Sequence, residues 1–140
     1  MNARRRSQKD ALRAAAAVGN VRLAEFLLDQ GADASSSDAS GVTPLHIGAE
    51  RGDSELVGLL LTSGARVNAA TDGGWTPLHG AAAAGHGEVV SLLLGWGADP
   101  DALDAGGETA LGAAAFWHRA EVVEMLARRP SFIGAARVAV

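Results

Sequence analysis

The sequence repeats itself at a fixed interval. The phrase TPLHIGAERGD, which begins at Thr43, returns 33 residues later as TPLHGAAAAGH at Thr76. The same offset reaches TALGAAAFWHR at Thr109 and, in the other direction, DALRAAAAVGN at Asp10. Self-similarity at a period of roughly 20–50 residues is the signature of a fold made of stacked, like units. The period therefore predicts a repeat solenoid before any single residue is interpreted.

The third copy shows what one unit contains. Thr76 suits a helix N-cap, and Pro77 suits the first helical position, where its missing N–H costs nothing. This helix runs through small residues and is expected to end at Gly85, because glycine adopts a left-handed conformation easily. A second helix, rich in valine and leucine, follows and ends at Gly97. Its apolar surface is too wide for one helical pair to bury, so neighbouring units must cover it.

The two helices of a unit differ in width. Alanines in the first helices let neighbours approach closely, whereas the leucines of the second helices need more room. The stack should therefore curve, with the first helices lining a concave groove. Turn-forming residues such as ADPDALDAGGE connect the units. We expect an all-α fold, a helical repeat solenoid with short β-hairpin loops, built from four helix-turn-helix units.

Each unit resembles an ankyrin repeat, a family with this period and a T-P-L-H-x-A signature. The resemblance covers roughly residues 5–136 and divides the chain into repeats at 5–37, 38–70, 71–103 and 104–136, which form a single domain over 1–140. It implies that the T-P-L-H threonine caps a helix, that the histidine ties neighbouring loops, that an aspartate opens each hairpin and that an asparagine pins the following loop. The residues at these structural positions are Asp38, Thr43, His46, Asn68, Thr76, His79 and Asp104.

Some positions depart from this pattern. In the third unit, Thr71 replaces the hairpin aspartate and Asp72 stands beside it, so we expect the hairpin hydrogen bond to shift by one residue. A metal or catalytic role for the two T-P-L-H histidines is the alternative to a structural one. The first unit lacks its leading hairpin and has Arg13 at the histidine position.

The fourth unit departs further, with Gly112 in place of histidine and Pro130 in place of the helix-ending glycine. Terminal units of a solenoid need a polar outer face. We therefore interpret the first and fourth units as caps and expect no further repeats.

The chain offers no candidate for catalysis. It has no cysteine, which excludes a disulfide framework and any zinc site built on thiolates. Nucleophile elbows, phosphate-binding loops and metal-ligand clusters are absent from the sequence. Asp99, Asp101 and Asp104 fall at ordinary loop positions, and the spacing of a calcium loop is missing. We expect no enzyme, no cofactor and no metal.

Charge is distributed unevenly along the chain. The net charge of −4 combines +4 in residues 1–13, −10 in residues 14–118 and +2 in residues 119–140, and no Lys or Arg lies between Val67 and His118. This field disfavours nucleic acid and favours a protein partner that presents basic and apolar groups.

The basic N-terminus has several interpretations. We expect the Arg4–Arg6 cluster to form a solvated, frayed end, with a targeting or nucleic-acid-binding tail as the alternative. No stretch is long and apolar enough for a signal peptide or a membrane span. We expect an intracellular, cytoplasmic protein.

The resemblance also implies a function. Ankyrin repeats bind other proteins through their hairpin tips and inner helix face, and large aromatic residues there are frequent hot spots. The alternatives are that Trp75 folds over its own hairpin and that the C-terminal aromatic pair seals the stack together with Phe132 and Ile133. By position, the candidate partner-binding residues are Val42, Glu50, Arg51, Asp72, Trp75, Glu108, Phe116 and Trp117.

We expect a monomeric, non-catalytic protein-binding module; weak self-association through the aromatic C-terminal surface is the alternative. A dedicated inhibitor or regulatory subunit is a second function to consider. The four-repeat cyclin-dependent kinase inhibitors of the family typically shorten the first helix of their second repeat, and the full-length TPLHIGAERG counts against that function. Nucleic-acid contact through the basic N-terminus is a third.

Overall fold

The computed structural model describes residues 2–128, with side chains from Asp10 onward, and this part of the chain forms eight helices. In chain order they are α1 (Asn2–Val18), α2 (Val21–Asp29), α3 (Pro44–Arg51), α4 (Ser54–Thr62), α5 (Pro77–Ala84), α6 (Gly87–Gly95), α7 (Ala110–Phe116) and α8 (Ala120–Arg128). Each repeat contributes one consecutive pair. None of the helices in this described part is long and apolar enough to cross a membrane.

The first helix of each internal repeat begins and ends as the sequence predicts. Thr76 is the N-cap of α5, and its hydroxyl accepts the backbone N–H of His79, while the His79 ring accepts the N–H of Thr76. Pro77 occupies the first turn, where its missing N–H leaves no bond unmade. Gly85 ends the helix at φ +80°, a left-handed conformation that glycine adopts without a side-chain clash.

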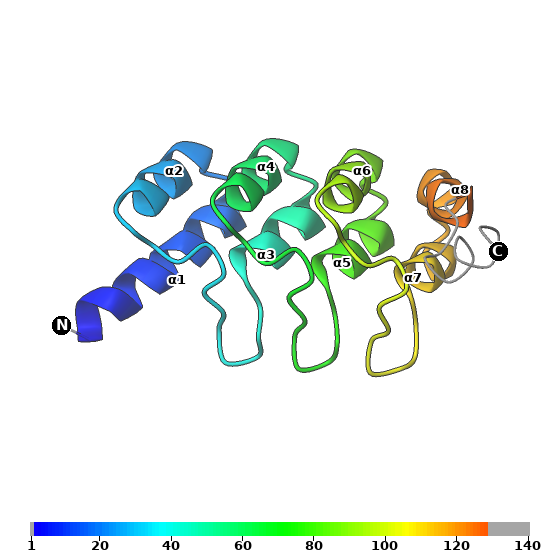
Figure 1. Cartoon of the computed structure of the whole chain (residues 1–140), viewed down its shortest axis with the longest axis horizontal. Helices are drawn as coiled ribbons and strands as arrows, with labels where there is room; N and C mark the ends of the chain where they lie inside the picture. The colour runs from blue at the N-terminus through cyan, green and yellow to red at the C-terminus, as the bar shows by residue number, and fades with distance from the viewer. Residues whose placement is uncertain (1, 129–140) are drawn as a thin grey trace, which may run out of the picture.

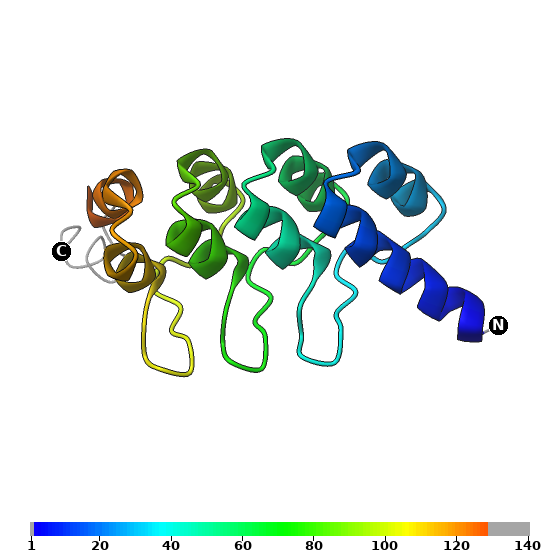
Figure 2. The ribbon, with the colours of Figure 1, turned by 180° about the vertical axis from the view of Figure 1, so that it is seen from behind.

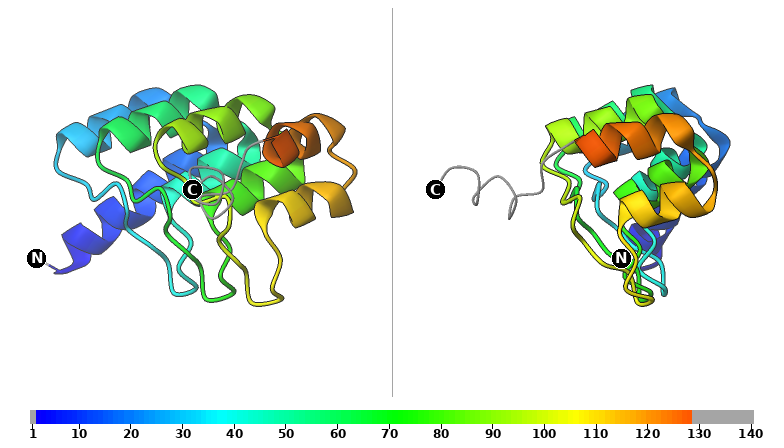
Figure 3. Two further views of the ribbon diagram at one scale, coloured as in Figure 1. Left: turned by 45° about the vertical axis from the view of Figure 1, so that its right-hand side comes forward. Right: turned by 90° about the vertical axis from the view of Figure 1, so that its right-hand side faces the viewer.

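The helices form two rows (Figure 1). Helices α1, α3, α5 and α7 lie side by side in an inner row, and α2, α4, α6 and α8 form an outer row, as the view from behind also shows (Figure 2). Neighbouring inner helices contact each other more extensively than neighbouring outer helices do. The closer approach of the inner row makes it the concave side of the stack. Seen along the stack, three loops extend beyond the inner row, away from the outer helices (Figure 3).

The three projecting loops are hairpins held by hydrogen bonds, although residues 2–128 contain no regular strand. Asp38 shows the pattern: its N–H donates to Val42 O over 2.9 Å, and its carboxylate accepts the N–H groups of Ser40 and Val42. The Val42 N–H is the main cause that holds the pKa of Asp38 below its ordinary value, against the effect of desolvation, and the Ser40 N–H and the charge of Arg13 lower the pKa further. Successive hairpins are also linked, since the N–H of Asp72 donates to Ser40 O over 2.9 Å.

The shift that we expected in the hairpin of the third repeat was wrong. The Trp75 N–H donates to the Thr71 hydroxyl over 3.2 Å, which is the same four-residue bond that Val42 makes with Asp38. A hydroxyl oxygen on Cβ reaches this donor as a carboxylate oxygen does, so the register is kept. Asp72 is left exposed at the loop.

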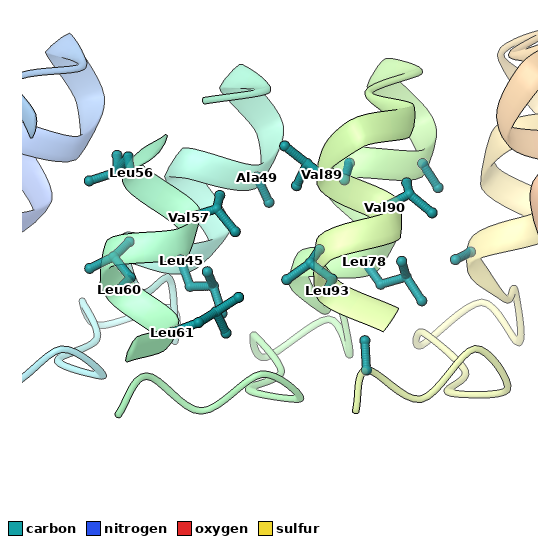
Figure 4. Packing of buried hydrophobic residues seen from close by; sticks show 14 of the residues in the cluster. Leu45, Ala49, Leu56, Val57, Leu60, Leu61, Leu78, Val89, Val90 and Leu93 are labelled. Carbon is teal, nitrogen blue, oxygen red and sulfur yellow. The ribbon is translucent and has the colours of Figure 1, made fainter. Parts of the chain in front are cut away.

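The core runs along the interface between the two rows (Figure 4). Its outer-row side is leucine and valine, and its inner-row side adds alanines such as Ala49, which let the inner helices come close. Burying each large aliphatic side chain stabilises the fold by about 1.5–3 kcal/mol. Five leucines are completely inaccessible to solvent: Leu12, Leu45, Leu56, Leu60 and Leu93.

The two ends of the stack differ from the expectation of polar caps. Arg4–Arg6 lie inside α1, which continues back to Asn2, so the backbone there is helical rather than frayed. The end face of the first repeat is only partly polar, because Val18, Leu23 and Phe26 are exposed on it.

The charged residues that suggested an N-terminal cap do not form a polar end face. Arg13 is half-buried and forms an ion pair with Asp10. At the other end, α8 does expose Glu121, Glu124 and Arg128. Pro130, Phe132 and Ile133 lie outside the described residues.

Candidate functional site

The two T-P-L-H histidines use both ring nitrogens in the fold. Nδ1 of His46 accepts the Thr43 N–H over 3.1 Å and lies 2.8 Å from the Thr43 hydroxyl, so the ring proton is on Nε2, which donates to Trp75 O over 2.8 Å. His79 repeats this geometry with Thr76 and with Glu108 O, the latter over 3.0 Å. Burial lowers the pKa of His46, which keeps the ring neutral.

These bonds leave no ring nitrogen of either histidine for a metal or for proton transfer. Among the described residues, no group of three or more His, Cys, Asp or Glu could hold a metal ion. The loop aspartates serve turn amides instead. Asp104 accepts the N–H groups of Gly106 and Glu108, and Asp99 accepts that of Asp101.

Loops on the outer-row side are tied together across repeats. The Asn68 side chain donates to Gly97 O over 3.2 Å and accepts the Asp99 N–H over 2.8 Å. In the preceding repeat, the Ser35 hydroxyl accepts the Arg66 N–H over 2.9 Å. Ser35 occupies the same repeat position as Asn68, and its shorter side chain makes one hydrogen bond to the next loop where Asn68 makes two.

Three of the candidate partner-binding residues meet in one pocket on the inner row. The pocket lies over α5 and has a volume of about 380 Å³. Its lining combines small residues of α5 with two tryptophans, an acid and a base. The lining residues are Glu50, Trp75, Gly80, Ala83, Ala84, Trp117 and Arg119.

The two tryptophans of this pocket, which we call the α5 pocket, have different surroundings. Trp75 is half-buried and stacks on His79, with ring centroids 5.1 Å apart and an interplanar angle of 26°. Its indole edge passes over Gly80. Trp117 is 55% exposed and meets Phe116 edge to face at 5.2 Å. Phe116 is 73% exposed but does not line the pocket.

The remaining candidate residues lie elsewhere. Asp72 and Glu108 are exposed on the hairpins, and Val42 is half-buried on the first of them. The Glu108 carboxylate folds over Gly112, where a Cβ atom would collide with it. Arg51 extends toward the preceding repeat, where its guanidinium donates to Ala17 O over 2.8 Å.

Two further residues make the same kind of contact, and the sequence interpretation missed both. Nε2 of His86 donates to Glu50 O over 2.9 Å, and Nε of Arg119 donates to Ala83 O over 2.8 Å. Both satisfy carbonyls at the end of the preceding inner helix, which have no partner within that helix. The signal was available, because His86 and Arg119 are 33 residues apart and therefore occupy the same repeat position.

The comparison with known protein families agrees with this geometry. A family model described as ankyrin repeats, in three copies, matches residues 1–71 and 50–135. No curated protein matches the chain.

Proposed function

Because the chain belongs to the ankyrin repeat family, whose members are generally protein–protein interaction modules and typically non-catalytic, we propose that it binds a protein partner through its inner row and hairpin tips. The observation that carries this proposal is the α5 pocket. Three repeats contribute to it, so a partner that fills the pocket contacts most of the stack at once.

The lining of the α5 pocket suits a protein side chain. The glycine and alanine residues of the lining let an inserted group approach the α5 backbone closely. The tryptophans present aromatic surface, and more than half of the Trp117 side chain is available to be covered. A tryptophan that a partner desolvates in this way is a typical hot spot, worth about 2 kcal/mol or more.

The charges around the pocket favour a partner with basic and apolar groups. Glu50 lines the pocket and is exposed, and Asp72 and Glu108 are exposed on the hairpins below it. The lining also contains one base, Arg119, whose Nε donates to Ala83 O, so the excess of negative charge comes from the hairpins. An apolar side chain between the tryptophans, with basic groups alongside these carboxylates, would satisfy both features and associate faster at low salt.

The proposal is tested by capture on the immobilised chain from a lysate of the cells that produce it, at two salt concentrations. The variant is Trp117→Ala, and the matched control is Trp96→Ala. Trp96 is also exposed, at 47%, but it ends α6 in the outer row and lies outside the α5 pocket. We expect a specific partner to bind Trp117→Ala about 30-fold more weakly, the equivalent of about 2 kcal/mol, and Trp96→Ala with unchanged affinity.

Two outcomes would contradict the proposal. Equal loss of binding in both variants would mean that exposed tryptophans bind other proteins nonspecifically. Binding that does not weaken with salt would contradict the basic partner. The narrower alternative, an inhibitor of the cyclin-dependent kinase type, is not favoured, because α3 and α5 both have eight residues and α3 is not shortened.

A further inference from the structure

The first repeat exposes a face that every later repeat covers. Leu23 is 40% exposed, whereas the residues at the same position in the other repeats, Leu56, Val89 and Val122, are completely buried. Phe26 is 58% exposed, and its equivalents are at least half-buried. We call the surface made by Val18, Arg22, Leu23, Phe26 and Asp29 the N-terminal face.

The repeat geometry shows what this face is shaped to contact. Leu92, an equivalent of Phe26, reaches back toward the preceding repeat, where a Cβ atom at Gly58 would lie 4.0 Å from it. Met125, the next equivalent, is likewise 3.3 Å from a Cβ built at Gly87. The side chain at this position therefore packs on the outer-row helix of the preceding repeat. For Phe26, no such helix exists within the described residues.

The charges of the N-terminal face are reversed relative to their own helix. Arg22 lies in the first turn of α2 and Asp29 is its last residue, so both oppose the helix dipole. The other three repeats carry glutamate at the position of Arg22, namely Glu55, Glu88 and Glu121, which follows the dipole. The stability of α2 alone does not explain this inversion.

Arg22, Phe26 and Asp29 also form a single stripe. Their spacing of four and then three residues places them on one side of α2. The stripe presents a positive group, an apolar ring and a negative group in order. Reversing the direction of such a stripe produces its own complement. Neither charge has an ion-pair partner among residues 10–128.

We propose that the N-terminal face binds a second copy of this chain, with the two α2 helices antiparallel about a two-fold axis near Phe26. Each Arg22 then meets Asp29 of the other copy and lies near the C-terminal end of that copy's α2. Each charge that opposes its own helix dipole thus complements the dipole of its partner. The contact is isologous and closes after two copies.

A head-to-tail arrangement of copies fits these observations less well. In a head-to-tail arrangement the N-terminal face would meet the fourth repeat, where Glu124 already pairs with Arg128 of its own helix. Such an arrangement also fails to close and produces filaments.

The test is sedimentation equilibrium of the full chain with charge-reversal variants. Arg22→Asp alone and Asp29→Arg alone each create two like-charge contacts per dimer, and each should weaken dimerisation roughly tenfold. The double variant restores opposite charges and should recover the wild-type dissociation constant. Each single change places a charge that the dipole of α2 favours, so neither variant should destabilise the helix. Weaker association could therefore not be attributed to loss of folding.

A second pair of variants locates the interface. Phe26→Asp places two like charges near the two-fold axis and should abolish the dimer. Phe116→Asp makes the same change at an exposed aromatic residue at the other end of the stack and should leave the dimer intact. The proposal is overturned if the wild type stays monomeric at the highest concentration, if the double reversal does not rescue the single ones, or if Phe116→Asp alone removes association. The outcome does not depend on the α5 pocket.

Discussion

Two glycines in the inner helices allow the packing argument to be tested with a single kind of substitution. Gly80 and Gly48 are both buried inside helices, α5 and α3 respectively. Replacing glycine with alanine in a helix interior raises the free energy of unfolding by about 0.8–1.0 kcal/mol, because alanine loses less backbone entropy on folding. Any difference between the two variants must therefore come from the space that the new methyl group enters.

The surroundings of Gly80 accept the methyl group. Its nearest neighbours would be Trp75 Nε1 at 3.4 Å and Glu50 Cγ at 3.8 Å, which are ordinary contact distances. We expect Gly80→Ala to raise the free energy of unfolding by about 1 kcal/mol, mostly from the backbone.

The surroundings of Gly48 are tighter. A methyl group there would lie 3.2 Å from Leu56 Cδ2 and 3.3 Å from Val57 Cγ2, and both of these side chains are fully buried. Overpacking a core commonly costs about 1–3 kcal/mol, which offsets the backbone gain. Gly48→Ala should therefore be neutral or destabilising.

Urea unfolding of the two variants and the wild type, followed by circular dichroism, measures the difference. With an unchanged m value, the midpoints compare stability directly. Gly80→Ala should also raise Tm by about 3–4 °C. The reasoning is refuted if Gly48→Ala stabilises the chain as much as Gly80→Ala does, or if Gly80→Ala lowers stability, since either result would mean that the distances do not report the available space.

Two further predictions concern histidines. Within the described residues, His118 is the only residue other than glycine with a positive φ, at 58°. The other repeats have glycine at this position: Gly19, Gly52 and Gly85. His118→Gly should therefore raise the free energy of unfolding, measured in a thermal melt, by about 0.5–1 kcal/mol, and no gain would contradict backbone strain at this position. For His46, burial lowers the pKa in the folded state, so the unfolded chain binds the proton more readily. The stability contributed by His46 should be fully present above about pH 6.5 and decline as pH falls through the lowered pKa. In urea unfolding, the difference in stability between wild type and His46→Gln should therefore shrink between pH 7.5 and 5.5. A difference that grows as pH falls would contradict a lowered pKa.

The period of the sequence was enough to predict the fold, because each unit carries its own start and stop signals. Thr76 and Pro77 start α5 and Gly85 ends it for local reasons, and local reasons can be read from sequence. The Thr71 hairpin shows the limit of this approach. The family pattern indicated a missing carboxylate, but only the structure shows that a hydroxyl makes the same bond.

The candidate site was less predictable, because its parts come from different repeats. Sequence position indicated that Trp75 and Glu50 share the side expected to bind a partner, but it could not show that Trp117 lines a pocket with them. The contacts of His86 and Arg119 depend on the distance between adjacent inner helices, which no single unit contains. The exposure of Leu23 could not be predicted either, because the equivalent residues in the other repeats are completely buried.

Trp75 is held by two histidines from two repeats. His46 fixes its backbone carbonyl from the second repeat, and His79 stacks against its ring from the third. Ordering a mobile side chain at an interface costs about 0.5–1.5 kcal/mol, and a ring that is already in place avoids that cost. The α5 pocket is therefore preorganised by the same hydrogen bonds that join the repeats. A partner that binds as we propose would meet an indole ring that is already in place. A change at His46, far along the sequence from Trp75, would then alter the α5 pocket through the contact between repeats.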